Sequence, residues 1–135
     1  MALLTLEQIR DEIERRAPLI GATGDLLPTY GRTEDFARPH IEVDAQQYHF
    51  VVVERGEELA RVSTTELDEL LYRVFEAATF SLACRYELRH RKPLEDSRRQ
   101  LFRVQVELLA KLDARWGERR AEAHRLTLLQ HPFSD

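Results

Sequence analysis

The stretch from Ser63 to Arg91 most constrains the fold, because it predicts one long helix with apolar residues on two sides. Ser63 and Glu66 have the spacing of a capping box, in which a hydroxyl and a carboxylate satisfy backbone N–H groups at a helix start. A helix that is apolar on two sides usually lies between other elements, so we predict a central helix with a sheet on one side and helices on the other. The apolar positions are Leu67, Leu70, Leu71, Val74, Phe75, Ala78 and Leu82 on one side, and Phe80, Cys84 and Leu88 on the second.

Three strands are predicted before this helix. Residues 40–44 alternate polar and apolar, which is typical of a strand with one solvated face. Residues 48–53 are rich in β-formers and apolar on both faces, as expected for a strand in the middle of a sheet. Residues 54–56 predict a three-residue hairpin loop with Gly56 in the left-handed conformation, and residues 57–62 return as the third strand. Such short connections predict an antiparallel meander.

Further helices are predicted at both ends of the chain. Thr5 opens another capping-box pattern and an amphipathic helix that ends at Pro18. After the central helix, residues 95–116 form a third amphipathic pattern, and the tight connection predicts an antiparallel hairpin of the second and third helices. Gly117 predicts a break or a kink, and residues 118–130 a short last helix. A glycine- and proline-rich loop follows the first helix, and a loop of its length can be functional.

Together these elements predict a single α+β domain over residues 1–135, in which a three-stranded antiparallel β-meander packs with about four helices. The composition, 43% hydrophobic and 33% charged, is typical of a soluble globular protein. Residues 1–7 lack the basic region of a signal peptide, and no uncharged apolar run approaches the roughly 20 residues of a membrane-spanning helix. We therefore expect a cytoplasmic protein. The lone Cys84 forms no intrachain disulfide.

The charge of the chain is unevenly distributed. Residues 1–70 contain 15 acidic residues and 7 arginines, whereas residues 71–135 contain 9 acidic and 13 basic residues, although the whole chain carries only −4. One interpretation is that the two halves neutralise each other across packed helices. The other is an acidic face that binds a basic partner.

Residues with catalytic or metal-binding chemistry form no recognised pattern. None of the five histidines has ligand spacing to an acid or a cysteine, and no nucleophile or phosphate-binding motif occurs. His49 is interpreted as a hydrogen-bonded imidazole within a strand, and Cys84 as a buried and therefore unreactive thiol. The expectation is a protein that is not an enzyme and that needs no cofactor or metal.

Two polar clusters could bind a macromolecule. Basic residues gather around the predicted helical hairpin, which a nucleic-acid-binding regulatory protein would also show. Glu87 is predicted to pair there with Arg99 or Arg103, which favours a structural role for these charges. Glu54, Glu57 and Glu58 gather at the hairpin tip, where they are either a solvated turn or a protein-binding patch. The basic residues are Arg85, Arg89, Arg91, Lys92, Arg98, Arg99 and Arg103.

Several short motifs, taken in their order and spacing, resemble one family of bacterial immunity proteins, immunity protein 63. The motifs are residues 48–57 (YHFVVVERGE), Leu70-Leu71-Tyr72, Phe75, Leu82-Ala83, Tyr86-Glu87, residues 96–102 (DSRRQLF) and residues 131–135 (HPFSD). The resemblance implies a small, non-enzymatic, cytosolic protein of a polymorphic toxin system. It would bind and neutralise a cognate toxin domain, which is often a nuclease or a nucleic-acid deaminase with a basic substrate cleft. The predicted partner-binding residues are Glu54, Arg55, Glu57 and Glu58.

Overall fold

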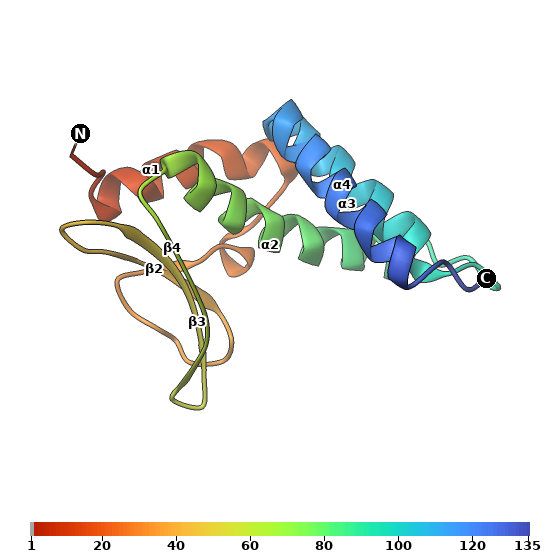
Figure 1. The fold of residues 1–135 in the computed structure, drawn as a ribbon, viewed down its shortest axis with the longest axis horizontal. Helices are drawn as coiled ribbons and strands as arrows, with labels where there is room; N and C mark the ends of the chain where they lie inside the picture. The colour runs from red at the N-terminus through yellow and green to blue at the C-terminus, as the bar shows by residue number, and fades with distance from the viewer. Residues whose placement is uncertain (1) are drawn as a thin grey trace. The chain divides into compact units, whose positions relative to one another are not determined.

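The computed structural model describes residues 2–135, and the chain divides into two compact units between Val74 and Phe75. The first unit contains α1 (Leu6–Arg16) and the sheet, and the second contains α3 and α4 (Figure 1). The long helix α2 (Leu67–Arg89) begins in the first unit and ends in the second. The predicted α+β class is confirmed, and so is the existence of this long helix.

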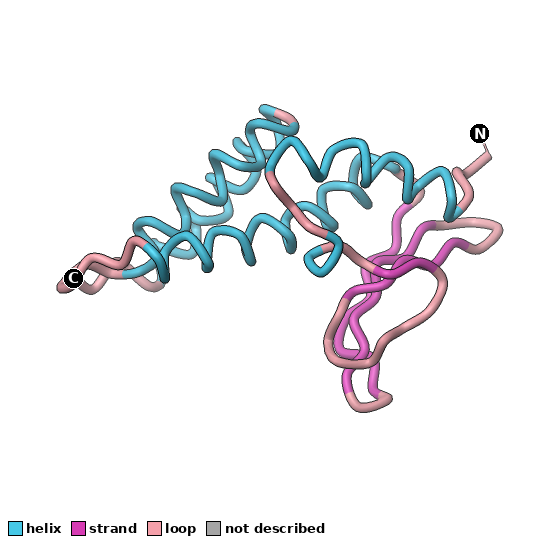
Figure 2. The backbone as a smooth tube through the Cα atoms, turned by 180° about the vertical axis from the view of Figure 1, so that it is seen from behind, coloured by secondary structure: helices cyan, strands magenta, loops and turns pink. Residues whose placement is uncertain are grey.

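The sheet has four strands rather than three. Its order is β1 (Thr29–Tyr30), β2 (Pro39–Val43), β3 (Tyr48–Glu54) and β4 (Glu57–Thr64), drawn in magenta in Figure 2. The predicted antiparallel meander is confirmed for the last three strands, whereas β1 pairs parallel to β2. Two residues are too short for a periodic sequence signal, so only pairing with a neighbouring strand identifies β1.

The core of the first unit forms where α1 meets the sheet. Ile9 and Ile13, one helical turn apart on α1, are fully buried, as are Ile41 of β2 and Val51 of β3. The capping box at the start of α1 is confirmed: Thr5 Oγ1 accepts from the N–H of Gln8, and the Gln8 side chain accepts from the N–H of Thr5. Two 3₁₀ turns, Ala17–Ile20 and Gly24–Leu26, follow the helix.

The capping box predicted for Ser63 and Glu66 is wrong. Ser63 lies in β4, where its hydroxyl is 2.7 Å from Nδ1 of His49. The N–H of Glu66 instead donates to Thr64 Oγ1, and α2 begins at Leu67. Strand pairing therefore extends β4 two residues beyond its predicted end.

In the second unit, α3 (Ser97–Leu112) and α4 (Ala114–Gln130) lie side by side as an antiparallel pair (Figure 1). Asp113 is the single residue between them: its N–H donates to Leu109 O, and its carboxylate accepts from the N–H of Arg115. No break occurs at Gly117, because α4 passes through it without interruption; the third helix, predicted over residues 95–116, ends instead at Leu112. Gly117 instead permits close packing, since a Cβ atom there would lie 2.9 Å from the Cβ of Ala110.

Along α2 the predicted second apolar side is largely solvent-accessible. Phe80 and Leu88 are 49% and 65% exposed, and Cys84 is partly exposed. A polar residue of the same helix is buried instead: Thr79 is fully buried, and its hydroxyl donates to the backbone carbonyl of Phe75. Composition alone does not distinguish such a satisfied polar side chain from an exposed one.

Candidate partner-binding site

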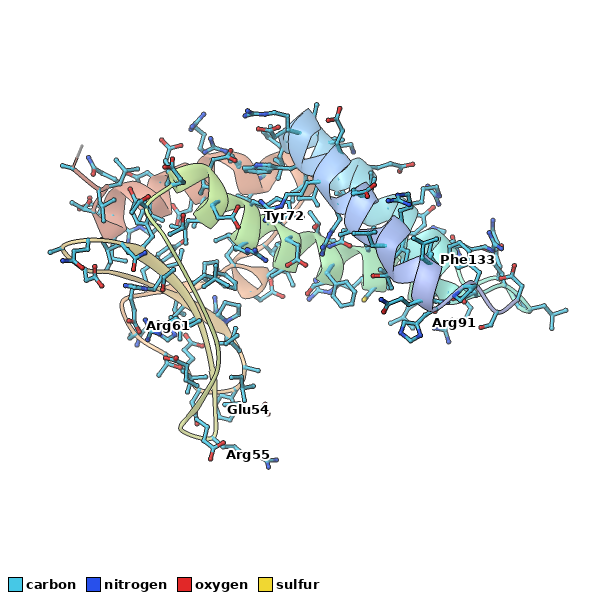
Figure 3. All side chains as sticks on the ribbon, viewed as in Figure 1. Glu54, Arg55, Arg61, Tyr72, Arg91 and Phe133 are labelled. Carbon is cyan, nitrogen blue, oxygen red and sulfur yellow. The ribbon has the colours of Figure 1, made fainter. Side chains whose placement is uncertain are left out.

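The hairpin tip between β3 and β4 is a two-residue turn. Glu54 pairs with Glu57, and Arg55 and Gly56 between them have φ of 54° and 75°. The prediction of a left-handed Gly56 is confirmed, but the predicted three-residue loop is one residue too long. Two consecutive left-handed residues match the twist of the flanking strands, so this turn holds the tip rigidly. Figure 3 shows Glu54 and Arg55 at the free end of the hairpin, with Arg61 farther back along β4.

Within residues 2–135, Glu58 is the one acidic tip residue with a charged partner. Arg61 contacts Glu58 at 2.7 Å and Glu42 of β2 at 3.3 Å, and Glu42 in turn contacts His40 at 2.8 Å. The hydrogen bond from Arg61 lowers the pKa of Glu58, which keeps the carboxylate ionised. Glu58 is therefore the end of an ion-pair chain across the sheet.

Glu54 and Glu57, in contrast, have no side-chain hydrogen bond or ion pair within residues 2–135. Together with Arg55 and Leu59 they line an open depression of about 450 Å³. A register shift after Val52 leaves Leu59 opposite no residue of β3, and Leu59 is 57% exposed. The structure thus brings three of the four predicted site residues together with an exposed leucine that the sequence analysis did not select.

A second segment of the first unit contacts the tip. In residues 31–38, which we name the Phe36 loop, Asp35 Oδ1 accepts from the N–H of Gly56 at 2.8 Å. The N–H of Ala37 donates to the carbonyl of Val53 at 3.0 Å. Figure 2 shows this pink loop beside the magenta strands. The length of the connection was the only sequence signal for a functional loop, and it did not indicate which strand end the loop would reach.

The basic residues around the end of α2 and the start of α3 are largely ion-paired. Four such pairs have nitrogen–oxygen distances of 2.7–3.3 Å: Arg91–Glu87, Arg98–Asp96, Arg99–Asp135 and Arg103–Glu107. The predicted pairing of Glu87 with Arg99 or Arg103 is therefore wrong. Pairing to carboxylates reduces the positive charge that this surface offers to a polyanion.

Among residues 2–135, no group of three or more histidine, cysteine or acidic side chains could hold a metal ion. The interpretation of His49 is confirmed, because its ring nitrogens lie within 2.7 Å of Ser63 Oγ and 2.6 Å of Asp44 Oδ2. Cys84 is less buried than predicted, but desolvation and the nearby Glu87 raise the pKa of its thiol, which disfavours the reactive thiolate.

These observations define a small α+β protein with an acidic hairpin tip between β3 and β4 as its candidate partner-binding site. The family model for immunity protein 63 matches residues 44–126, which include β3, β4, α2 and α3. The chain belongs to this family, so the resemblance seen in the sequence is confirmed. The comparisons with curated proteins and with solved structures find no match. No helix within residues 2–135 combines the length and the apolar content needed to cross a membrane.

Proposed function

We propose that this protein is an immunity protein that binds and neutralises a cognate bacterial toxin domain in the cytoplasm. Membership of the immunity protein 63 family, over residues 44–126, is the observation that carries the proposal. The exposed carboxylates of Glu54 and Glu57 at the hairpin tip, which have no charged partner within residues 2–135, support a binding role. Such a protein acts by occlusion and has no catalytic activity of its own.

The proposed toxin-binding surface includes Glu54, Arg55, Glu57 and Glu58. The left-handed turn fixes the backbone at this tip, so less conformational freedom is lost on binding than for a flexible loop. Unpaired carboxylates at the tip attract a basic partner and increase the rate of productive encounter. A toxin with a basic substrate cleft would present complementary charge, and the bound immunity protein would cover that cleft.

The ion pairs of the second unit count against the alternative of a nucleic-acid-binding regulator. Arg91, Arg98, Arg99 and Arg103 each have a carboxylate partner. A phosphate-binding surface would have to break these pairs, and its affinity would fall steeply with salt. Titration of labelled DNA and RNA at two salt concentrations tests this alternative directly.

Co-expression tests the proposed function. The first step is to read the gene directly upstream: where it encodes a secreted protein, the C-terminal domain of that protein is the probe, expressed from an inducible promoter in a sensitive host. We expect growth arrest with this domain alone and normal growth when the present chain is co-expressed. Growth arrest that persists despite soluble expression of the present chain rejects the proposal.

Charge substitution tests the proposed surface separately. Glu54→Lys combined with Glu57→Lys removes the unpaired acids without disturbing the Glu58–Arg61 pair, and Glu58→Gln tests that pair alone. Glu118→Lys, on an exposed glutamate of α4, is the matched control. We expect the double substitution to slow association with an inactive form of the same toxin domain and to weaken its salt dependence. Unchanged kinetics would exclude the tip as the docking surface.

A further inference from the structure

Phe36 is exposed over 88% of its surface, although a phenyl ring gains free energy by leaving water. A single exposed apolar residue is ordinary on a protein surface and identifies no site by itself. Leu94 is one such isolated exposed residue: it is 95% exposed and lies next to the ion-paired residues at the start of α3. Leu94 also has a left-handed backbone, with φ of 69°, but Phe36 differs from it in two ways: both neighbours of Phe36 in the chain are hydrogen-bonded to the hairpin, and acidic residues surround it.

The two residues that flank Phe36 have a left-handed backbone conformation, which residues other than glycine rarely adopt. Asp35 and Ala37 have φ of 58° and 60°, in the left-handed region that disfavours side chains with a Cβ. Both are tied to the hairpin, Asp35 through its carboxylate to Gly56 and Ala37 through its N–H to Val53. Arg38 fixes the end of the same loop by donating to the carbonyls of Leu27 and Gly24. The phenyl ring is thus presented from a fixed position beside the tip.

The charges around the ring define the partner that would cover it. Glu34 and Asp35 belong to the Phe36 loop, and Glu54, Glu57 and Glu58 belong to the tip, against Arg32, Arg38 and Arg55 in these two segments. Two of these carboxylates, Glu54 and Glu57, have no charged partner in the described chain. An aromatic residue ringed by polar groups is the usual composition of an energetically dominant interface position, where the rim excludes water from the centre.

We infer that Phe36 is the apolar anchor of the toxin-docking surface, inserting into an apolar slot whose rim on the toxin is cationic. The inference rests on the proposed function and adds a residue, a loop and a partner chemistry to it. The surface then has two parts: the hairpin tip, which lies within the family-matched residues 44–126, and the Phe36 loop, which lies outside them. The carboxylates steer the toxin into contact, and the ring determines how long it stays bound.

The test measures binding of a catalytically inactive variant of the same toxin domain to the immobilised full-length chain. Phe36→Ala is expected to weaken binding by roughly tenfold or more, mainly through faster dissociation, because burial of the ring is lost. Phe36→Leu should retain most of the affinity, and Leu94→Ala, the control of matched exposure, should retain all of it. Glu54→Lys with Glu57→Lys should act differently, by slowing association and reducing its salt dependence.

The possible outcomes separate the inference from the proposed function. If the unchanged protein neither binds the toxin domain nor protects cells, the proposed function fails. If the unchanged protein and Phe36→Ala bind and protect equally, with the same circular dichroism spectrum, only the inference is overturned. Sedimentation of the free protein gives the remaining outcome: a dimer that Phe36→Ala dissociates would assign the ring to a contact between two copies and would also overturn the inference.

Discussion

Glu87 accepts two hydrogen bonds from the guanidinium of Arg91, one turn further along α2, at 2.7 and 3.1 Å. The Glu87 residue is only 4% exposed, and the hydrogen bonds from Arg91 lower the pKa of its carboxyl group. Arg99 and Arg103 instead reach Asp135 and Glu107. The contact is local because residues four apart in a helix lie on the same face, so no packing between helices is needed to form it.

The first prediction concerns this pair. Glu87→Gln and Arg91→Gln should each lower the free energy of unfolding, and the double mutant should lose less than the sum, because either change breaks the same contact. Since folding lowers the pKa of Glu87, its contribution is complete above the ordinary value of 4.5 and is lost as pH falls below it. Urea denaturation at pH 7 and pH 3.5 measures both effects. Coupling of Glu87 to Arg99 rather than to Arg91 would contradict the assignment.

The second prediction concerns the close approach of α3 and α4. In Gly117→Ala, overpacking should cost about 1–3 kcal/mol, because the new Cβ would lie 2.9 Å from the Cβ of Ala110. Alanine normally brings about 1 kcal/mol to a helix interior, so we expect a net loss of stability of up to about 2 kcal/mol. Gly24→Ala is the control, because nothing lies within 4 Å of a Cβ added there. Thermal and chemical denaturation would contradict the prediction if Gly117→Ala were the more stable variant.

The third prediction concerns the turn at the hairpin tip. Gly56→Ala should cost about 1–2 kcal/mol, because φ of 75° is unfavourable for a residue with a Cβ. Arg55→Asn should stabilise the protein by up to about 1 kcal/mol, since asparagine followed by glycine is the preferred sequence of this turn type. Arg32→Asn, at a position without left-handed backbone, should show no such gain. Equal effects of the two asparagine substitutions in urea denaturation would argue against the left-handed turn.

The fourth prediction concerns His124 in α4. Burial and the nearby Arg120 lower the pKa of its imidazole to about 4, and the ring stacks on Phe102 with centroids 3.9 Å apart. Between pH 6.5 and 4 the unfolded chain therefore binds a proton that the folded chain does not, so stability falls as pH falls through this window. His124→Phe, which keeps an aromatic ring, should flatten this part of the pH profile. His131→Phe, at an exposed histidine, should leave it unchanged.

Only part of the candidate site could be predicted from the sequence. The tip residues could be selected from the sequence because Gly56 and the cluster of acids are adjacent in the chain. The sequence could not show that Glu58 is ion-paired whereas Glu54 and Glu57 are not. The partner of Glu58 is Arg61, and Arg61 also contacts Glu42 of a neighbouring strand. Phe36 could not be selected for the same reason. It lies beside the tip because its neighbour Asp35 is hydrogen-bonded to Gly56, and these two residues are about 20 positions apart in the chain.

The sequence by itself determined the elements that depend on neighbouring residues. Alternation predicted β2, a run of β-forming apolar residues predicted β3, the spacing of Thr5 and Gln8 predicted the start of α1, and helical periodicity predicted the long helix α2. Each of these signals lies within a few neighbouring residues.

Only the tertiary structure decided which of several chemically equivalent partners each side chain contacts. It paired Ser63 with His49 rather than with a helix end, and it turned Gly117 from a predicted break into a point of close contact. Such choices depend on distances between segments that are remote in sequence, and these distances exist only once the chain has folded.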